Sequence, residues 1–306
     1  MSYPQAVTLA LGSVWIALGW CHTAISSPQI RPEAHTRQPD ARARLDRHSA
    51  YAFLDGVGAV WPEDFDHGAA PLNASTGFLL DRCHVLTNLH AVYPEDLVVN
   101  PPVGKRVAFG VGQTDGDARR GAARGLRFLF HGSVVAHGDT HIVDHVVQQP
   151  EDDWALVHLD TGADPVIPAL AIVAISPRQL QPGTPVATAG FPVDHRALRP
   201  DGFNFKDLWG SAGELVTVAS TSNAGAMVES TLQTTFGMSG GPLYLIDPTT
   251  NRVAAVAPAA VAVIGMVQGF RGNGIDVSAQ MPSAQLVFTP ALAARIGSAV
   301  TRTPCQ

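Results

Sequence analysis

The sequence predicts an all-β protein in two antiparallel halves, followed by one C-terminal helix. The chain of 306 residues is 46% hydrophobic and only 15% charged, and it contains 29 Gly and 23 Pro. Such a composition favours many short strands joined by turns over long helices or coiled coils. Apolar runs of strand length begin near residue 56, and the polar, proline-containing stretch at residues 172–183 separates them into two sets.

Each set contains six apolar runs bounded by turn residues. The first set comprises residues 56–61, 76–80, 84–87, 106–111, 128–136 and 154–159. The second set comprises residues 185–189, 213–219, 227–232, 241–246, 253–256 and 261–267. Residues 112–125 are too polar and too rich in glycine for a core, so we expect an exposed loop there. Thr289 followed by proline is a typical helix start, which predicts a helix over the alanine-rich residues 291–300.

The N-terminal segment predicts a secretory signal peptide over residues 1–24. Residues 1–30 contain no Asp, Glu, Lys or Arg, and the apolar run at residues 6–20 is too short to span a membrane. Small residues follow where a signal peptidase can cut, although an uncleaved anchor or a misassigned start codon are alternatives. Residues 25–50 are polar and rich in arginine, which predicts a linker or pro-segment. We therefore expect a secreted or periplasmic protein whose mature chain makes no stable membrane insertion.

Charge and cysteine content restrict the partners and the compartment. The formal net charge is −6, which argues against nucleic acid as a partner of the whole chain. If Cys21 leaves with the signal peptide, Cys83 and Cys305 remain. In an oxidising compartment these two cysteines can form a disulfide, but a buried thiol at Cys83 and a free thiol at Cys305 are equally compatible with the sequence.

The most informative motif is a serine flanked by glycines, in residues 236–243 (FGMSGGPL). The glycines allow a tight turn that exposes the Ser239 hydroxyl, and the N–H groups of Gly237 and Ser239 can then form an oxyanion hole. A simple hairpin can carry the same pattern. The motif also fits the nucleophile turn of α/β-hydrolases, but that fold needs a histidine after the serine, and the last histidine here is His195.

Two further motifs lie upstream of this serine. His90 ends the apolar stretch at residues 85–92 (VLTNLHAV), and Asp153 precedes the apolar run at residues 154–159. Each pattern alone is common. In the order His, Asp, Ser, however, the three motifs resemble those of the chymotrypsin/trypsin-like serine peptidases. Residues 189–192 (AGFP) also resemble a Gly-Tyr-Pro or Gly-Asn-Pro turn of the bacterial members.

The resemblance covers roughly residues 51–300 and implies the chymotrypsin-like fold. That fold has two antiparallel six-stranded β-barrels, here at about residues 51–171 and 184–300, with a C-terminal helix. By analogy Ser239 is the nucleophile, His90 the general base and Asp153 the residue that orients the imidazole. We prefer Asp153 to its neighbour Asp152, because the aspartate of the family directly precedes a hydrophobic residue and an alanine. Gly237 and Ser239 supply the oxyanion hole, and no cofactor or metal is implied.

Departures from the animal trypsins point to the branches of the glutamyl endopeptidases and Deg proteases. Ala91 replaces the cysteine that follows the histidine, and Met238 replaces the aspartate that precedes the serine. The position six residues before the nucleophile holds Gln233, so cleavage after Arg or Lys is not expected. Thr234 can donate a hydrogen bond to a glutamate side chain. We therefore take Gln233 and Thr234 as candidate substrate-binding residues.

The sequence thus predicts a secreted serine endopeptidase acting on protein or peptide substrates. A catalytically silent binding module and an esterase-like acyl hydrolase on the same scaffold are the alternatives. Four histidines lie at spacings of six, four and four in a strand-and-loop segment, namely His131, His137, His141 and His145. These spacings do not form a helical face, so we expect solvated histidines there and no metal site.

Overall fold

The computed structural model describes residues 43–45, 52–63, 74–93, 103–113, 126–140, 142–143, 146–192, 208–221, 225–250, 252–257, 260–270 and 283–305. The chain divides into the units Met1–Arg37 and Gln38–Gln306, and all described residues belong to the second unit. The predicted signal peptide, most of the predicted linker and most of the predicted loop at residues 112–125 lie outside the described residues.

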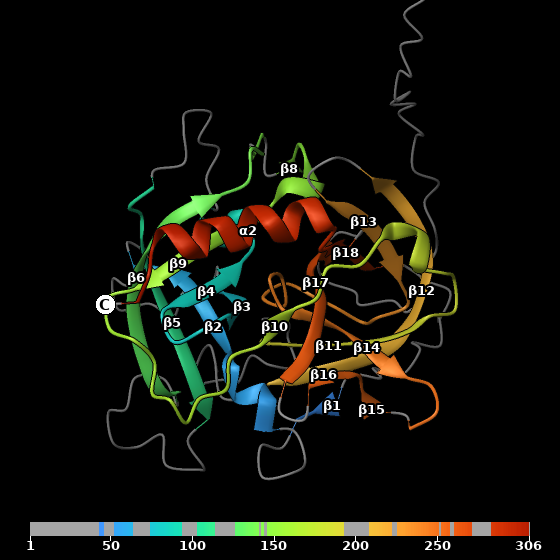
Figure 1. The fold of residues 1–306 in the computed structure, drawn as a ribbon, viewed down its shortest axis with the longest axis horizontal. Helices are drawn as coiled ribbons and strands as arrows, with labels where there is room; N and C mark the ends of the chain where they lie inside the picture. Colours follow the sequence, from blue (N-terminus) through green and yellow to red (C-terminus); the bar gives the residue numbers. More distant parts are fainter. Residues whose placement is uncertain are drawn as a thin grey trace, which may run out of the picture. The chain divides into compact units, whose positions relative to one another are not determined.

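Six strands of the first half close into an antiparallel barrel in the order β2-β3-β4-β9-β6-β5 (Figure 1). They are β2 (Val57–Pro62), β3 (Ser75–Leu79), β4 (His84–Thr87), β5 (Arg106–Gln113), β6 (Leu126–His137) and β9 (Ala155–Leu159). Branched and aromatic side chains fill its interior, including Val60, Val85, Phe109 and Val157.

The second barrel repeats this strand order. It consists of β11 (Pro185–Gly190), β12 (Trp209–Thr221), β13 (Ala226–Ser230), β14 (Pro242–Asp247), β17 (Ala260–Phe270) and β18 (Ser283–Val287). The pairing of β14 with β17 closes the ring β11-β12-β13-β18-β17-β14. In each barrel the first strand pairs with the second and the fourth, so the two halves share one topology. The predicted fold of two antiparallel six-stranded barrels is confirmed.

One barrel strand was not predicted. The run at residues 253–256 was expected to be a strand of the second half, but it forms two short strands, β15 (Arg252–Val253) and β16 (Ala255–Ala257), beside the barrel. The sixth barrel strand is β18 instead. Ser283 and Gln285 in this strand are fully buried although polar, so the strand shows no continuous apolar run.

Short elements connect and flank the barrels. A 3-10 turn, η1 (Ala52–Gly56), precedes β2, and a two-stranded ribbon consists of β7 (Ile142–Val143) and β8 (Val146–Val147). The 3-10 turn η4 (Pro150–Asp152) leads into β9. The crossing between the barrels contains β10 (Ala171–Ile172), which pairs in parallel with β17, and the 3-10 turn η5 (Pro177–Gln179).

Part of the predicted linker is attached to the second barrel. Strand β1 (Ala43–Arg44) pairs with Gly210 and Trp209 of β12, and the N–H of Leu45 donates to the Leu208 carbonyl oxygen at 2.8 Å. The partly buried Leu45 side chain packs against the main hydrophobic core. This piece of the chain therefore belongs to the folded unit.

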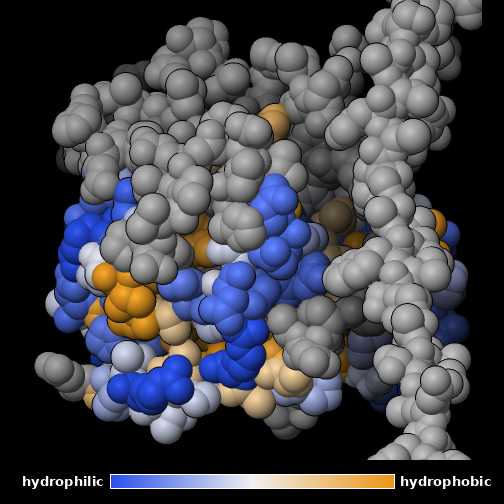
Figure 2. All heavy atoms as spheres, turned by 90° about the horizontal axis from the view of Figure 1, so that it is seen from above, coloured by the Kyte–Doolittle hydropathy of each residue, from blue (hydrophilic) through white to orange (hydrophobic). Residues whose placement is uncertain are grey.

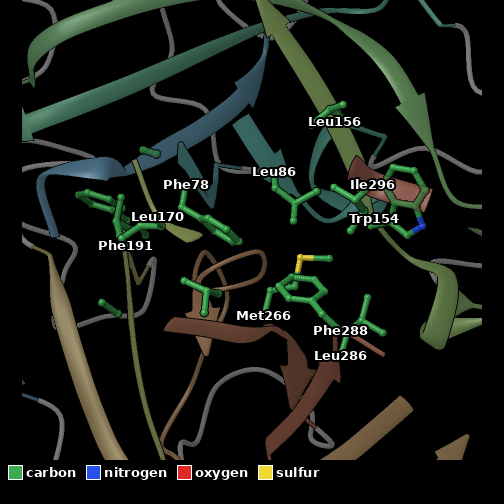
Figure 3. Packing of buried hydrophobic residues seen from close by; sticks show 14 of the residues in the cluster. Phe78, Leu86, Trp154, Leu156, Leu170, Phe191, Met266, Leu286, Phe288 and Ile296 are labelled. Atoms are coloured by element: carbon green, nitrogen blue, oxygen red, sulfur yellow. The ribbon is translucent and has the colours of Figure 1, made fainter. Parts of the chain in front are cut away.

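The largest core lies between the two barrels and is shared by them (Figure 3). The first barrel and the strand entry before β9 supply Phe78, Leu86 and Trp154, and the second barrel supplies Met266 and Leu286. Ring and methyl surfaces from both halves are removed from water together. This burial gives the barrels a fixed contact.

The C-terminal helix α2 (Pro290–Arg302) packs on this shared core. The Thr289 hydroxyl oxygen accepts the Leu292 N–H at 3.2 Å, so the predicted N-cap is present. Leu292, Ile296 and Ala299 are buried at spacings of four and three, which places them on one helix face. In Figure 1 the helix (red) runs from β18 across to the side of the first barrel.

A disulfide fastens the end of this helix to the first barrel. Cys83, in the turn between β3 and β4, is bonded to Cys305 with an S–S distance of 2.06 Å and a Cα–Cα distance of 5.6 Å. Of the two alternatives left by the sequence, the structure contains the bonded pair. The bond joins positions that are 222 residues apart in the chain.

Few large apolar side chains are exposed on the surface of the described ranges. Among the described residues the exposed large hydrophobics are Val103, Leu129, Val166, Val216 and Phe236. On the face shown in Figure 2, hydrophobic residues form small patches between hydrophilic ones. None of the helices in the described ranges is both long enough and apolar enough to cross a membrane.

Candidate active site

His90 lies in the short helix α1 (Leu89–Val92), directly after β4. Leu89, Ala91 and Val92 are buried and anchor this turn to the first barrel, whereas the His90 side chain keeps 26% of its surface exposed. Asn88 precedes the helix in an extended conformation and is buried. The buried neighbours therefore hold this turn in place, while part of the imidazole remains accessible to solvent.

Asp153 holds His90 through two hydrogen bonds. The Nδ1 of His90 lies 2.5 Å from Asp153 Oδ2, and the backbone N–H of His90 donates to Oδ1 at 3.0 Å. Asp153 is fully buried. A carboxylate can only accept, so the imidazole carries its proton on Nδ1 and leaves Nε2 as an acceptor.

The pKa of His90 is raised above its ordinary value of 6.5. Burial of the ring is the largest single influence and opposes protonation. The negative charge of Asp153 and its hydrogen bond together outweigh burial, because both stabilise the imidazolium. The geometry thus favours a histidine that accepts a proton readily.

Gln268 and Asn88 form a chain of amides behind the aspartate. The side-chain N–H of Gln268 donates to Asp153 Oδ2, and the Gln268 oxygen accepts from Asn88 Nδ2 at 3.0 Å. Asn88 Nδ2 also donates to the Asp153 backbone oxygen at 2.9 Å. Since Gln268 belongs to β17 and Asn88 precedes α1, this chain fixes Asp153 from both barrels at once.

Asp152, the alternative aspartate, points away from His90. Its Oδ1 accepts from the indole N–H of Trp154 at 2.9 Å and from Arg295 at 2.8 Å. Its Oδ2 accepts from the backbone N–H of Asp139 at 2.8 Å. The structure therefore brings Asp153, and not Asp152, to the histidine.

Ser239 lies in two consecutive β-turns between β13 and β14. The N–H of Met238 donates to the Thr235 oxygen at 3.0 Å, and the N–H of Gly241 donates to the Met238 oxygen at 2.9 Å. Gly237 and Gly240, at the third position of each turn, have φ angles of 85° and 80°. A type II turn requires such an angle at this position, which explains the two glycines around the serine.

The serine turn lies against the histidine segment of the other barrel. The N–H of Thr76 donates to the Ser239 carbonyl oxygen at 2.8 Å, and the Thr76 hydroxyl donates to the Gly237 oxygen at 2.6 Å. A methyl group at Gly240 would collide with the Thr76 carbonyl oxygen and approach the Asn88 nitrogen. Ser239 is thus adjacent to the residues that lead into His90. Its Oγ lies 3.5 Å from the Gln268 carbonyl oxygen.

The N–H groups of Gly237 and Ser239, the predicted oxyanion hole, lie in these two consecutive turns. Within the described part of the chain, no hydrogen bond takes up either N–H group. The neighbouring N–H groups of Met238, Gly240 and Gly241 all donate to backbone carbonyls. The two turns therefore have two donors available next to the serine hydroxyl.

The predicted substrate-binding residues are buried beside this turn. The N–H of Gln233 donates to the Ser211 hydroxyl at 2.8 Å, and the hydroxyls of Thr234 and Ser283 lie 2.5 Å apart. Ser283 also donates to the Gly269 carbonyl oxygen at 3.2 Å. These contacts contain no charged group, and they involve β18, the strand that was not predicted.

The two described histidines of the histidine-rich segment have hydrogen-bond partners outside the proposed site. His131 and His137 belong to β6, where Nδ1 of His131 lies 2.8 Å from Glu63 and Nδ1 of His137 lies 2.6 Å from the Gly138 carbonyl oxygen. His141 and His145 lie outside the described residues. Among the described residues, the group with metal-ligand spacing is Asp81 with Cys83 and Cys305, whose sulfurs are bonded to each other.

A family model described as the trypsin-like peptidase domain matches residues 75–256, which is more than half of the chain. The chain belongs to the trypsin-like peptidase family. The match includes His90, Asp153 and Ser239 and ends before Gln268. The expected resemblance to chymotrypsin/trypsin-like serine peptidases is confirmed.

Two solved protease structures are similar to this chain, and the first of them supports the fold. A Glu endopeptidase in complex with MPD is similar with a TM-score of 0.53 at 15% identity, over 86% of this chain and 98% of that chain. A thermostable serine protease from an extremophilic microorganism matches with a TM-score of 0.49 at 15% identity, over 82% of this chain and 99% of that chain. No curated protein matches the sequence.

Sequence reasoning missed Gln268 and Asn88 in this trypsin-like peptidase. Neither amide is a typical nucleophile, acid or base, so neither stood out among the chemistry-bearing residues. A weak signal was present for Gln268, because it is a polar residue directly after the apolar run at residues 261–267. Only the pairing of the two barrels shows that both amides meet Asp153.

Proposed function

We propose that the protein is a serine endopeptidase in which His90, Asp153 and Ser239 form the catalytic triad. The observation that carries this proposal is the buried Asp153 carboxylate bonded to Nδ1 of a partly exposed His90, with the glycine-flanked Ser239 turn against the same segment. This arrangement leaves Nε2 as the acceptor on the open side of the ring. Nε2 can therefore accept the hydroxyl proton of Ser239, as activation of a serine nucleophile requires.

Acylation begins when Ser239 Oγ attacks the substrate carbonyl carbon and its proton passes to Nε2 of His90. Asp153 stabilises the imidazolium, and the free N–H groups of Gly237 and Ser239 stabilise the oxyanion. The C–N bond then breaks, and the leaving amine takes the proton from His90. A water molecule repeats the cycle on the acyl-enzyme, with His90 taking the water proton and returning it to Ser239.

The substrate class is a protein or peptide, and cleavage after Lys or Arg is not expected. Gln233 is neutral, and the hydrogen bonds described for Gln233, Thr234 and Ser283 join backbone groups and hydroxyls. No negative charge in this set would pair with a basic side chain. We further propose a secreted or periplasmic location, which the Cys83–Cys305 disulfide supports because such bonds persist in oxidising compartments.

A fluorophosphonate adduct tests nucleophile and activity together. We expect mass spectrometry to place the adduct on Ser239, and Ser239→Ala to abolish labelling while the circular dichroism spectrum is retained. Peptide and simple ester substrates are compared in parallel, which distinguishes an endopeptidase from an esterase-like hydrolase. A protein that takes no label and cleaves no substrate would contradict the proposal and favour a silent binding module.

A further inference from the structure

The C-terminal helix makes an ionic contact with the residue next to the proposed catalytic aspartate. Arg295 of α2 donates from Nη1 to Asp152 Oδ1 at 2.8 Å, and its guanidinium lies over the Trp154 ring at 5.6 Å. Arg295 and Asp152 differ in exposure, with 36% and 9% of their side chains accessible. The contact is therefore largely shielded from water on the aspartate side, where an ion pair is stronger than at the surface.

Asp152 is the centre of a network that surrounds Asp153. Its carboxylate accepts from the Trp154 indole, from Arg295 and from the Asp139 N–H. The backbone here is also tightly packed, since a methyl group at Gly138 would collide with the Asp152 carbonyl oxygen. The residues immediately before and after Asp153 are thus bonded to each other through one carboxylate, which leaves the segment little freedom.

Without Arg295, burial of the charged Asp152 carboxylate would cost free energy. Asp152 is buried, and its two other partners are neutral N–H donors. Removing the cation would leave a buried negative charge directly beside Asp153, which is unfavourable unless the carboxylate takes up a proton or moves toward water. Such a movement would displace the Asp153 segment, because Asp152 and Trp154 flank it.

We propose that Arg295 is a positioning residue of the active site, which acts through Asp152 to hold Asp153 in line with His90. This inference rests on the proposed function of the triad. It assigns a catalytic consequence to the C-terminal helix, which packs on the core shared by both barrels and, within the described residues, forms no hydrogen bond with His90 or Ser239. Asp153 would otherwise be held by the amides of Gln268 and Asn88 and by its bonds to His90.

The test compares Arg295→Met with a matched variant on the same helix. Arg302 is exposed and donates to Ser298 Oγ of its own helix at 2.9 Å, so Arg302→Met removes an equal charge without touching Asp152. We expect Arg295→Met to lower kcat by about tenfold to a hundredfold with KM within about twofold, as a small misplacement of a catalytic group does. Arg295→Lys should recover part of kcat, and Arg302→Met should match the wild type.

A double-mutant cycle tests whether the effect passes through Asp152. If it does, Arg295→Met combined with Asp152→Asn loses no more than the worse single variant. Asp139→Asn serves as a second control, because its carboxylate is 89% exposed and lies 3.4 Å from the Arg295 Nη2. This variant keeps the Asp139 N–H that bonds to Asp152, and we expect it to leave kcat unchanged.

A readout without turnover keeps this test separate from the proposed function. In the Ser239→Ala background, the His90 Nδ1 proton should exchange with water faster after Arg295→Met, because a displaced Asp153 holds it less tightly. An inactive wild-type protein would refute the proposed function. The exchange rate would still test whether Arg295 positions Asp153. An unchanged kcat and exchange rate in Arg295→Met, an equal loss in Arg302→Met, or multiplicative losses in the double variant would overturn the inference.

The Arg295→Lys variant keeps the proposal testable if Arg295→Met fails to fold. If Arg295→Met does not fold, Arg295→Lys is measured alone against Arg302→Met. A lower kcat at unchanged KM in Arg295→Lys supports positioning, since the melting temperature alone would report only packing. Wild-type kcat in Arg295→Lys together with an unfolded Arg295→Met would show that the arginine contributes stability only, and the proposal would fail.

Discussion

At the scale of single residues, the site depends on a contrast in exposure between bonded partners. The His90 side chain is partly open to solvent, whereas Asp153 is fully buried and its carboxylate accepts hydrogen bonds from His90 and Gln268. Little water competes for the carboxylate, so its interaction with the imidazole is stronger than the same pair would have at the surface. The aspartate therefore determines both the tautomer and the basicity of His90.

Asp153→Asn is expected to lower kcat by about 10⁴-fold, as in the serine-peptidase triad. An asparagine nitrogen facing Nδ1 would favour the wrong imidazole tautomer, since two donors cannot share that contact. Steady-state kinetics on one peptide substrate measures the loss. Asp160→Asn is the surface control, because Asp160 is exposed and pairs with Arg106. A loss below tenfold in Asp153→Asn would contradict the assigned role.

The pH dependence of kcat/KM should reflect the raised pKa of His90. The base must be neutral to accept a proton, so activity falls as the pH drops through this pKa. Because the pKa is raised above 6.5, the acid limb should have its midpoint above pH 6.5. A profile from pH 5 to 9 measures it, and a midpoint below pH 6.5 would be inconsistent with the Asp153 contact.

At the scale of elements, the serine turn depends on a glycine that touches the opposite barrel. Gly240 has a φ of 80° and no room for a Cβ, because Thr76 and Thr87 pack against it. Gly183 has nearly the same φ, 81°, but open space around it. Substituting Gly183 therefore measures the cost of the backbone conformation alone, whereas substituting Gly240 adds the cost of a steric collision.

Gly183→Ala should destabilise the protein by about 1 kcal/mol, the cost of a left-handed conformation for an L residue. Gly240→Ala carries the same cost and also forces the serine turn away from Thr76. We expect it to lower the free energy of unfolding further and to reduce kcat by at least about tenfold. Urea denaturation and kinetics on both variants give the comparison. Equal effects on stability and activity would show that the close approach is unimportant.

The elements that the sequence predicts well are those with uniform burial. The run at residues 84–87 matches β4 because all four side chains are buried. Strand β18 escaped prediction because Ser283 and Gln285 are buried through hydrogen bonds with each other and with Thr234. Likewise His90, Asp153 and Ser239 stand in recognisable local motifs, whereas Gln268 acquires its contact only when β17 meets the first barrel. Local patterns cannot report a partner 115 residues away.

At the scale of the whole molecule, the two barrels are joined by a shared core and by the helix that follows the second barrel. The bonds between this C-terminal segment and the first half include the Arg295–Asp152 ion pair and the Cys305–Cys83 disulfide. Near the disulfide, Thr303 Oγ1 and His84 Nε2 lie 2.9 Å apart. The segments that carry His90 and Asp153 are thus both connected to the same helix.

Replacing Cys83 or Cys305 by serine should lower the free energy of unfolding by about 2–5 kcal/mol. The bond closes a loop of 222 residues, so its removal enlarges the unfolded ensemble considerably. Urea denaturation under non-reducing conditions measures the change. The double variant should be no less stable than the worse single variant. Stability equal to the wild type in all three variants would show that the bond does not constrain the unfolded chain.

The position of this helix in the chain has a consequence for biosynthesis. A ribosome makes His90, Asp153 and Ser239 before it makes Arg295 and Cys305, because the helix follows all three in the sequence. A nascent chain can therefore contain every triad residue while the bonds that hold two of their segments are still missing. Completion of the site is thereby tied to the synthesis of α2 and Cys305, and a chain cut short before Arg295 would emerge with the residues of the proposed triad but without the bonds that Arg295 and Cys305 make to the first barrel.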